Sequence, residues 1–204
     1  MSFTLATNAV APEFNLVGSD GKNHSFKELS GEKGTLIFFT CNHCPHVIGS
    51  EERMQALFEK CVSLDISMVA IHSNETKAHA GDSFEQVLVR MREKGFRWLS
   101  LNDENQTVAL AFGAERTPHY FLFSKEGVLV YSGRMDNSPR NVNKVQTHEL
   151  ENAIGDMLAG RAVEVPFTPA IGCNVKWWDK DAHWMPKESC DLDYLYQRID
   201  SQAL

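Results

Sequence analysis

The sequence predicts an α/β domain with a mixed central sheet flanked by helices on both faces. Continuous apolar runs at residues 35–40 and 66–72 are typical of strands buried on both faces. Segments with apolar residues at helical spacing alternate with these strands, which favours layers joined by right-handed crossovers. A hairpin at the start and two late strands, at residues 119–124 and 128–133, make the sheet mixed rather than purely parallel.

The elements are expected in the order hairpin, then β-α-β-α-(short strand)-α-β-β-α. Residues 12–29 form an edge hairpin, because Phe14 and Leu16 alternate with polar neighbours ahead of the turn at Asp20 and Gly21. The first helix follows the first buried strand directly. Its apolar residues fall on one stripe: Val47, Ile48, Met54, Leu57, Phe58 and Cys61.

The later helices are predicted from their end signals. Asp82 and Glu85 form a capping-box pattern before the second helix, which Gly95 ends. A shorter helix begins near Asp103 and ends at Gly113. The last helix ends at Gly160 and has a clean apolar face, made of Leu150, Ala153, Ile154, Met157 and Leu158.

The helical and strand patterns stop near residue 160. Residues 1–160 are therefore predicted to form one domain, and residues 161–204 an aromatic-rich C-terminal extension. The extension contains three tryptophans, at positions 177, 178 and 184, which a disordered tail rarely has. We expect it to pack on the domain and not to form an independent one.

Composition excludes several classes of function. A formal charge of -7 disfavours nucleic acid as a partner, and no apolar run approaches the roughly 20 residues of a membrane span. The first residues lack the basic and apolar regions of a signal peptide, so we expect a reducing, cytoplasmic location. Five cysteines, with only one close pair, do not resemble a secreted disulfide framework.

That close pair lies where a buried strand meets a helix. Cys41 and Cys44 are separated by Asn42 and His43, and Pro45 follows as a suitable first helical residue. A helix N-terminus stabilises an anion, so the pKa of Cys41 is expected to be lowered. His43 adds a positive neighbour when protonated. Cys44, one turn along, is expected to be the more buried and less acidic thiol, able to close a disulfide with Cys41.

The pair also has two other interpretations. Two cysteines at this spacing are also half of a zinc site, and buried cysteine is often only a small apolar side chain. A zinc site needs two more ligands, for which His46 or the distant Cys173 are available. The position after a buried strand in a β-α-β pattern favours redox chemistry. A structural role is favoured for Cys173, although a third redox thiol is the alternative, and Cys190 is taken as a bystander.

A second motif completes the pattern, because Thr117 and Pro118 immediately precede a hydrophobic strand. With both motifs the chain resembles the thioredoxin superfamily, in particular the redoxin branch related to alkyl hydroperoxide reductase and thiol-specific antioxidant proteins. The resemblance extends over roughly residues 9–178. Its matching segments are residues 11–14, 20–22, 41–45, 73–74, 117–118, 121–123, 129–134 and 172–177.

The resemblance implies a thioredoxin-like fold and a set of substrate contacts. Pro118 is expected in the cis form next to Cys41, and Thr117 is expected to offer backbone groups to an extended substrate segment. Asn42 and Arg116 are the other expected substrate contacts. A histidine between the cysteines, here His43, is similar to the pattern of the more oxidising members of the superfamily. A cation at this position stabilises the reduced thiolate form and so raises the reduction potential.

The resemblance also implies a mechanism. Cys41 attacks a disulfide as a thiolate, and Cys44 resolves the resulting mixed disulfide. The carboxylates that related proteins use for proton transfer are absent, which leaves His46, or His43, for that role.

The predicted function is therefore a thiol–disulfide oxidoreductase. A thiol-dependent, peroxiredoxin-like antioxidant peroxidase is the alternative, although the Pro-x-x-x-Thr-x-x-Cys motif is missing: Gly34 and Phe38 stand in those places before Cys41. The alternative from another class is a metal-binding or metallochaperone module that uses Cys41, Cys44 and His46. The expected partners are a protein or small-molecule disulfide or thiol and an electron donor. No cofactor and no resident metal are expected.

Overall fold

The structure is a computed structural model and describes residues 4–179. The main strands are β1 (Asn15–Gly18), β2 (Asn23–Ser25), β3 (Gly34–Thr40), β4 (Ile66–His72), β5 (Leu99–Asn102), β7 (His119–Ser124) and β8 (Leu129–Gly133). Two short strands are β6 (Arg116–Thr117) and β9 (Cys173–Asn174). The α-helices are α1 (Phe26–Leu29), α2 (Pro45–Ile48), α3 (Glu51–Ser63), α4 (Phe84–Lys94), α5 (Thr107–Phe112) and α6 (Glu149–Leu158).

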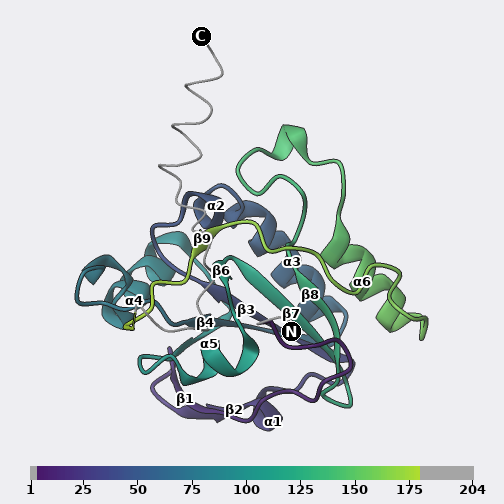
Figure 1. Cartoon of the computed structure of the whole chain (residues 1–204), viewed down its shortest axis with the longest axis horizontal. Helices are drawn as coiled ribbons and strands as arrows, with labels where there is room; N and C mark the ends of the chain where they lie inside the picture. Colours follow the sequence, from purple (N-terminus) through teal and green to yellow (C-terminus); the bar gives the residue numbers. More distant parts are fainter. Residues whose placement is uncertain (1–3, 180–204) are drawn as a thin grey trace.

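The seven main strands form one mixed sheet in the order β2-β1-β5-β4-β3-β7-β8 (Figure 1). β3 pairs in parallel with β4 and antiparallel with β7, so it lies inside the sheet and is buried along its whole length. Side chains alternate along it. Leu36 and Phe38 join the apolar cluster beneath α3 and α6, whereas Ile37 and Phe39 join the cluster beneath α5. The mixed sheet, its two covered faces and the edge hairpin are as predicted.

The first predicted helix is divided in two, which the sequence pattern did not show. α2 ends at Ile48, and α3 begins at Glu51 after Gly49 and Ser50. A Cβ added to Gly49 would lie 2.8 Å from the Cα of Arg140, so the loop before α6 packs directly on the break. The break therefore lies at a contact between segments far apart in sequence, which the local pattern does not encode.

The expected capping box before the second long helix is wrong. The N-cap of α4 is Ser83, whose hydroxyl accepts a hydrogen bond from the backbone N–H of Gln86. Asp82 ends the preceding 3-10 helix (Ala80–Asp82), and its side chain turns toward the cysteines. The predicted end of α4 is confirmed, because Gly95 follows it in the left-handed conformation, φ 69°.

Residues 161–179, here called the arm, run back from the end of α6 alongside β6 (Figure 1). Thr168 pairs with the backbone of Ser132 in β8, 3.0 Å from N to O. Further along, Trp177 is only 2% exposed and joins the cluster beneath α5, while the Trp178 ring donates to the carbonyl of Glu104. The arm thus packs through two of its tryptophans. Trp184 and Cys190 lie outside the described residues.

None of the helices within residues 4–179 is both long enough and apolar enough to cross a bilayer.

Candidate active site

The two cysteines of the motif meet β6 at the end of the sheet. Cys41 follows β3 directly, and Cys44 is the N-cap residue of α2. Both face Thr117: the Cys41 sulfur lies 3.3 Å from its hydroxyl, and the Cys44 sulfur lies 3.0 Å from its carbonyl oxygen. The peptide bond between Thr117 and Pro118 is cis, as expected. The structure therefore brings together the two sequence motifs, which are more than 70 residues apart.

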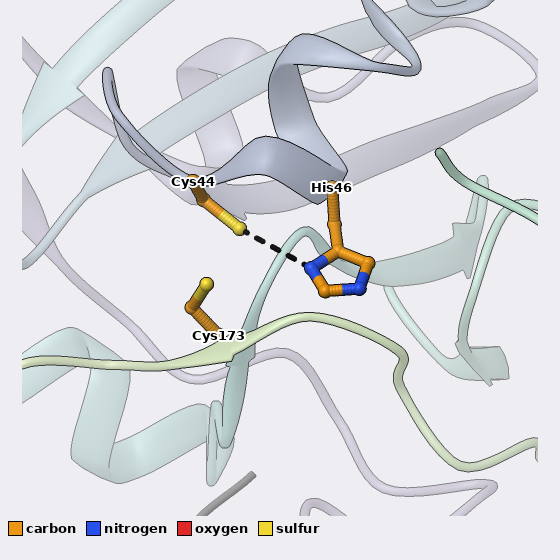
Figure 2. A group of neighbouring side chains, drawn as sticks. All are labelled: Cys44, His46 and Cys173. Carbon is orange, nitrogen blue, oxygen red and sulfur yellow. Dashed lines mark hydrogen bonds between the residues drawn. The ribbon is translucent and has the colours of Figure 1, made fainter. Parts of the chain in front are cut away.

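The sulfur of Cys44 has two further neighbours that come from different parts of the chain. Figure 2 shows it with His46 of α2 and Cys173 of the arm, and the three ligand atoms lie within 4.8 Å of one another. The Nδ1 atom of His46 is 3.8 Å from the Cys44 sulfur, a distance consistent with the proton-transfer role predicted for it. Cys44 is fully buried and Cys41 is 4% exposed, whereas Cys173 is partly exposed.

The predicted order of the two pKa values is wrong. A hydrogen bond to Cys44, burial and the charge of Asp82 raise the pKa of Cys41. Hydrogen bonds from Cys173 and then Cys41, together with one from His46, lower the pKa of Cys44. The carbonyl of Thr117 favours the thiol form of Cys44, but the donors outweigh it. These donors favour the thiolate form of Cys44 over that of Cys41 in this conformation.

The physical reason for this error is the surroundings of Cys41. α2 begins at Pro45, as expected, but the Cys41 thiol is buried and lies near the charged Asp82 carboxylate, and both disfavour its thiolate. The expected burial of Cys44 is confirmed. Its expected lower acidity is not, because the donors around its sulfur belong partly to the distant arm.

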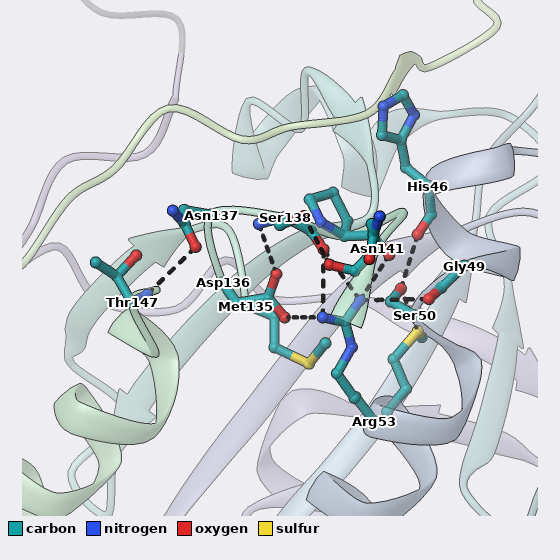
Figure 3. A network of polar contacts seen from close by, with 12 residues as sticks. His46, Gly49, Ser50, Arg53, Met135, Asp136, Asn137, Ser138, Asn141 and Thr147 are labelled. Atoms are coloured by element: carbon teal, nitrogen blue, oxygen red, sulfur yellow. Dashed lines mark hydrogen bonds and ion pairs between the residues drawn. The ribbon is translucent and has the colours of Figure 1, made fainter. Parts of the chain in front are cut away.

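α2 is held in place by a polar network at its C-terminal end (Figure 3). The Ser50 hydroxyl donates to the carbonyl of His46 at 2.8 Å. Arg53 of α3 forms an ion pair of 2.9 Å with the buried carboxylate of Asp136 and donates to the carbonyl of Pro139 at 2.6 Å. These contacts link the helix that carries Cys44 and His46 to the loop between β8 and α6.

A second polar network holds the loop between the cysteines. Asp82 accepts from the backbone N–H of Asn42 at 2.8 Å and from the side chain of Asn74 at 2.7 Å, and it lies 2.9 Å from His43 Nδ1. The His43 ring stacks on His79 with centroids 5.8 Å apart. Sequence reasoning missed Asp82 as a site residue, because its pattern with Glu85 indicated a helix cap.

The contact with Asp82 predicts a pH-dependent group at the site. The hydrogen bond that the His43 ring donates to the Asp82 carboxylate raises the pKa of His43. The pair therefore stabilises the fold fully below the unfolded-state pKa of histidine, about 6.5, and this contribution is lost as pH rises through the higher folded-state value. In Asp82→Asn, an NMR titration of the His43 ring should give a lower pKa than in the wild type. Asp20→Asn, which removes the carboxylate beside His24 in the hairpin, is the matched control. An unchanged His43 pKa in Asp82→Asn would contradict the assignment.

The residues predicted to contact substrate lie against the arm or the site loops. Thr117 of β6 pairs with Cys173 of β9, and Arg116 pairs with Asn174 and donates to its side chain. Asn42 donates through its side chain to the carbonyl of Gly81 at 2.8 Å. The strand edge at Thr117 and Arg116 is thus occupied by the chain's own arm.

Two sets of side chains have the donor atoms and spacing of a metal site within the described residues. One is Cys44, His46 and Cys173, and the other is Cys41, His43 and Asp82. The predicted set of Cys41, Cys44 and His46 is therefore divided between them. Thiolate and imidazole are ligands suited to zinc, but a closed structural zinc site takes four protein ligands.

Comparison with known proteins gives a family and two similar structures. The model of the Redoxin family matches residues 6–154. An uncharacterized conserved protein from Geobacillus kaustophilus is 32% identical, with a TM-score of 0.80 over 87% of this chain and 94% of that chain. A hypothetical protein from Sinorhizobium meliloti 1021 is 31% identical, with a TM-score of 0.79 over 85% of this chain and 96% of that chain. No curated protein matches the sequence.

A more distant structure shows the fold alone. The thioredoxin domain of a thiol-disulfide oxidoreductase from Bacteroides vulgatus is 18% identical, with a TM-score of 0.53 over 63% of this chain and 89% of that chain. Together with the family match, these similarities confirm the predicted thioredoxin-like fold. The arm lies beyond the residues that the family model matches.

Proposed function

The chain belongs to the redoxin family of the thioredoxin superfamily, and we propose that it is a thiol–disulfide oxidoreductase in which Cys41 and Cys44 alternate between dithiol and disulfide. Membership of this family supports a thiol-based redox function. The observation that supports disulfide exchange is that the two sulfurs meet at Thr117, beside its cis bond to Pro118: Cys41 lies 3.3 Å from the Thr117 hydroxyl and Cys44 lies 3.0 Å from the Thr117 carbonyl oxygen. One of two neighbouring thiols can attack a substrate disulfide as a thiolate. The second thiol then displaces the substrate and closes the internal disulfide.

The proposed cycle starts from the Cys44 thiolate. It attacks one sulfur of a substrate disulfide, so that one S–S bond breaks, a mixed disulfide forms and a thiolate leaves. Cys41 then loses its proton and attacks the Cys44 sulfur, which releases the second substrate thiolate and closes the Cys41–Cys44 disulfide. In the proposed cycle His46 takes up and returns a proton, which is supported by the distance of 3.8 Å between its Nδ1 and the Cys44 sulfur. The resemblance assigned the first attack to Cys41, and the pKa directions favour Cys44.

The proposed substrate is a protein or small-molecule disulfide, and a dithiol is the proposed electron donor for the return step. Both cysteines are buried, with exposures of 4% for Cys41 and 0% for Cys44. Direct attack by Cys44 therefore requires the arm, whose Cys173 lies against its sulfur, to move aside.

Redox equilibration tests the proposal. Protein equilibrated with mixtures of reduced and oxidised dithiothreitol, then alkylated and digested with trypsin, yields Gly34–Arg53 as one peptide that contains both cysteines. We expect this peptide to change from two alkylated thiols to one internal disulfide in a single two-electron transition, in which a tenfold change in equilibrium constant corresponds to about 30 mV. The midpoint should be unchanged in Cys61→Ser, because Cys61 lies in the core beneath α3 and α6.

Three results would contradict the proposal. One is a peptide that stays fully alkylated at every ratio. Another is peroxide consumption that survives in Cys44→Ser, which would indicate a peroxidase acting through Cys41 alone. The third is stoichiometric metal in protein purified without a tag, lost in Cys44→Ser, which would indicate a metal-binding module.

A further inference from the structure

The arm occupies the strand edge beside the two cysteines and brings a third one to it. β9 pairs antiparallel with β6, with Cys173 opposite Thr117 and Asn174 opposite Arg116. The backbone N–H of Val175 also donates to the carbonyl of Glu115 at 3.1 Å. An extended segment that adds a strand in this way has the geometry of a bound peptide. Here the peptide belongs to the chain itself.

The close approach of the arm depends on a glycine. A Cβ added to Gly172 would lie 2.0 Å from the carbonyl oxygen of Thr117 and 2.6 Å from its carbonyl carbon. No side chain fits in that space, so only glycine at position 172 lets the next residue lie over the cysteines. The carbonyl that Gly172 touches is the one that lies 3.0 Å from the Cys44 sulfur.

The arm is fixed on both sides of this crossing. Before it, Thr168 pairs with Ser132 of β8. After it, the Lys176 backbone N–H donates to the side chain of Asn74 at 2.9 Å, and the Lys176 carbonyl accepts from Gln106 at 2.7 Å. Trp177 is buried next to it. Residues 169–173 therefore cross the site between two anchors, which keeps Cys173 at a high local concentration near Cys44.

The Cys44 sulfur is in contact with both Cys41 and Cys173. It accepts hydrogen bonds from both Cys173 and Cys41, and the Cys173 sulfur is within 4.8 Å of it (Figure 2). A disulfide needs a separation of about 2.05 Å, which side-chain rotation can supply from this starting point. Of the three cysteines, Cys173 is the one with appreciable exposure to solvent.

We propose that Cys173 is a third redox thiol, which exchanges with Cys44 and so connects the buried Cys41–Cys44 pair to disulfides and dithiols outside the protein. This inference rests on the proposed function of the pair. The Cys173 thiolate attacks an external disulfide, so that one S–S bond breaks, one forms and a thiolate leaves. Cys44 then attacks the Cys173 sulfur and releases the second external thiolate. Cys41 finally attacks Cys44 and releases the Cys173 thiolate. Each step exchanges one S–S bond for another, and an external dithiol drives the same sequence backwards.

Disulfide mapping in a defined variant tests the relay. In Cys41→Ser with Cys61→Ser and Cys190→Ser, only Cys44 and Cys173 remain. Oxidation of the native protein with oxidised glutathione should link the tryptic peptides Gly34–Arg53 and Ala162–Lys176 within one chain. The matched control carries Cys44→Ser with Cys61→Ser and Cys190→Ser and retains Cys41. Its available partner for Cys173 is therefore Cys41, which lies three residues before position 44. We expect the Cys44–Cys173 link to form at least about tenfold faster than the Cys41–Cys173 link, because the Cys173 sulfur lies beside that of Cys44 in the structure.

A second variant keeps the result interpretable. Gly172→Ala in the background that retains Cys44 and Cys173 should slow the link at least about tenfold, because its Cβ displaces the arm from Thr117. Circular dichroism and a thermal melt check that the variant is folded. Equal rates for the two pairs, or no Cys44–Cys173 link in the folded protein, would overturn the relay.

The failure of the relay is distinguishable from the failure of the proposed function. Cys173→Ser retains Cys41 and Cys44, and its Gly34–Arg53 peptide should still acquire the internal disulfide. If the internal disulfide forms in Cys173→Ser, but Cys44 does not link to Cys173 in the variant with Cys41→Ser, the relay alone is wrong. If the internal disulfide is also missing there and in the wild type, the proposed function itself is wrong.

Discussion

Cys44→Ser should lose thiol–disulfide exchange by at least about a hundredfold, more than any other single cysteine substitution. Cys44 is the sulfur in contact with both Cys41 and Cys173, so its removal leaves neither pair able to form. A serine hydroxyl can still donate to the carbonyl of Thr117, 3.0 Å from the present sulfur, so the fold should persist. The rate at which the protein transfers electrons from dithiothreitol to oxidised glutathione measures the effect.

Cys61→Ser is the matched control, because it removes a thiol of similar burial that has no redox role in the proposal. Cys61 lies on α3 in the core, where burial raises its pKa to about 12. Its replacement should leave the exchange rate within about twofold of the wild type. Exchange at the wild-type rate in Cys44→Ser would mean that Cys41 or Cys173 acts without it.

The sheet was predictable because its signals are local. β3 and β4 are continuous apolar runs whose burial follows from composition, and their boundaries are confirmed to within one residue. Gly95 and Gly113 end α4 and α5 in the left-handed conformation, as a C-terminal glycine usually does. Such elements need no knowledge of what packs against them.

The two motifs of the site were also predictable, but their chemistry was not. Cys41, Cys44 and Thr117 meet as the resemblance implies. The order of the two pKa values depends on which donors reach each sulfur. For Cys44 the leading donor is Cys173, more than 120 residues away in the chain. The β6–β9 pairing, a long-range contact, helps to bring it there.

Asp82 shows why local patterns mislead at a functional site. Its spacing from Glu85 matches a capping box, and a cap was indeed needed at that place. Ser83, one residue later, supplies the cap instead, which leaves the Asp82 carboxylate free to hold Asn42 and His43. The sequence alone does not distinguish these two positions for the helix start, because both residue types are good caps.

The second large effect concerns the aromatic cluster beneath the sheet, centred on Phe112. This side chain of α5 is fully buried. Its ring lies 5.3 to 6.5 Å, between centroids, from four others, those of Phe14, Phe39, Phe121 and Phe123. Phe112→Ala should lower the free energy of unfolding by about 3–5 kcal/mol, because it removes buried apolar area and leaves a cavity among stiff neighbours. Urea unfolding followed by circular dichroism measures the change.

Leu110→Ala is the matched control on the same helix, because Leu110 is 41% exposed and lies outside both core clusters. Leu110→Ala should lower the free energy of unfolding by less than about 1 kcal/mol, because it removes little buried apolar area. A similar loss in both variants would contradict the assignment of Phe112 to the centre of the core. The contrast also bears on the site, because α5 leads through Gly113 into β6, which carries Thr117. If the cluster positions β6 against the cysteines, Phe112→Ala should increase the alkylation rate of Cys41 and Cys44 below the unfolding transition, while Leu110→Ala should not.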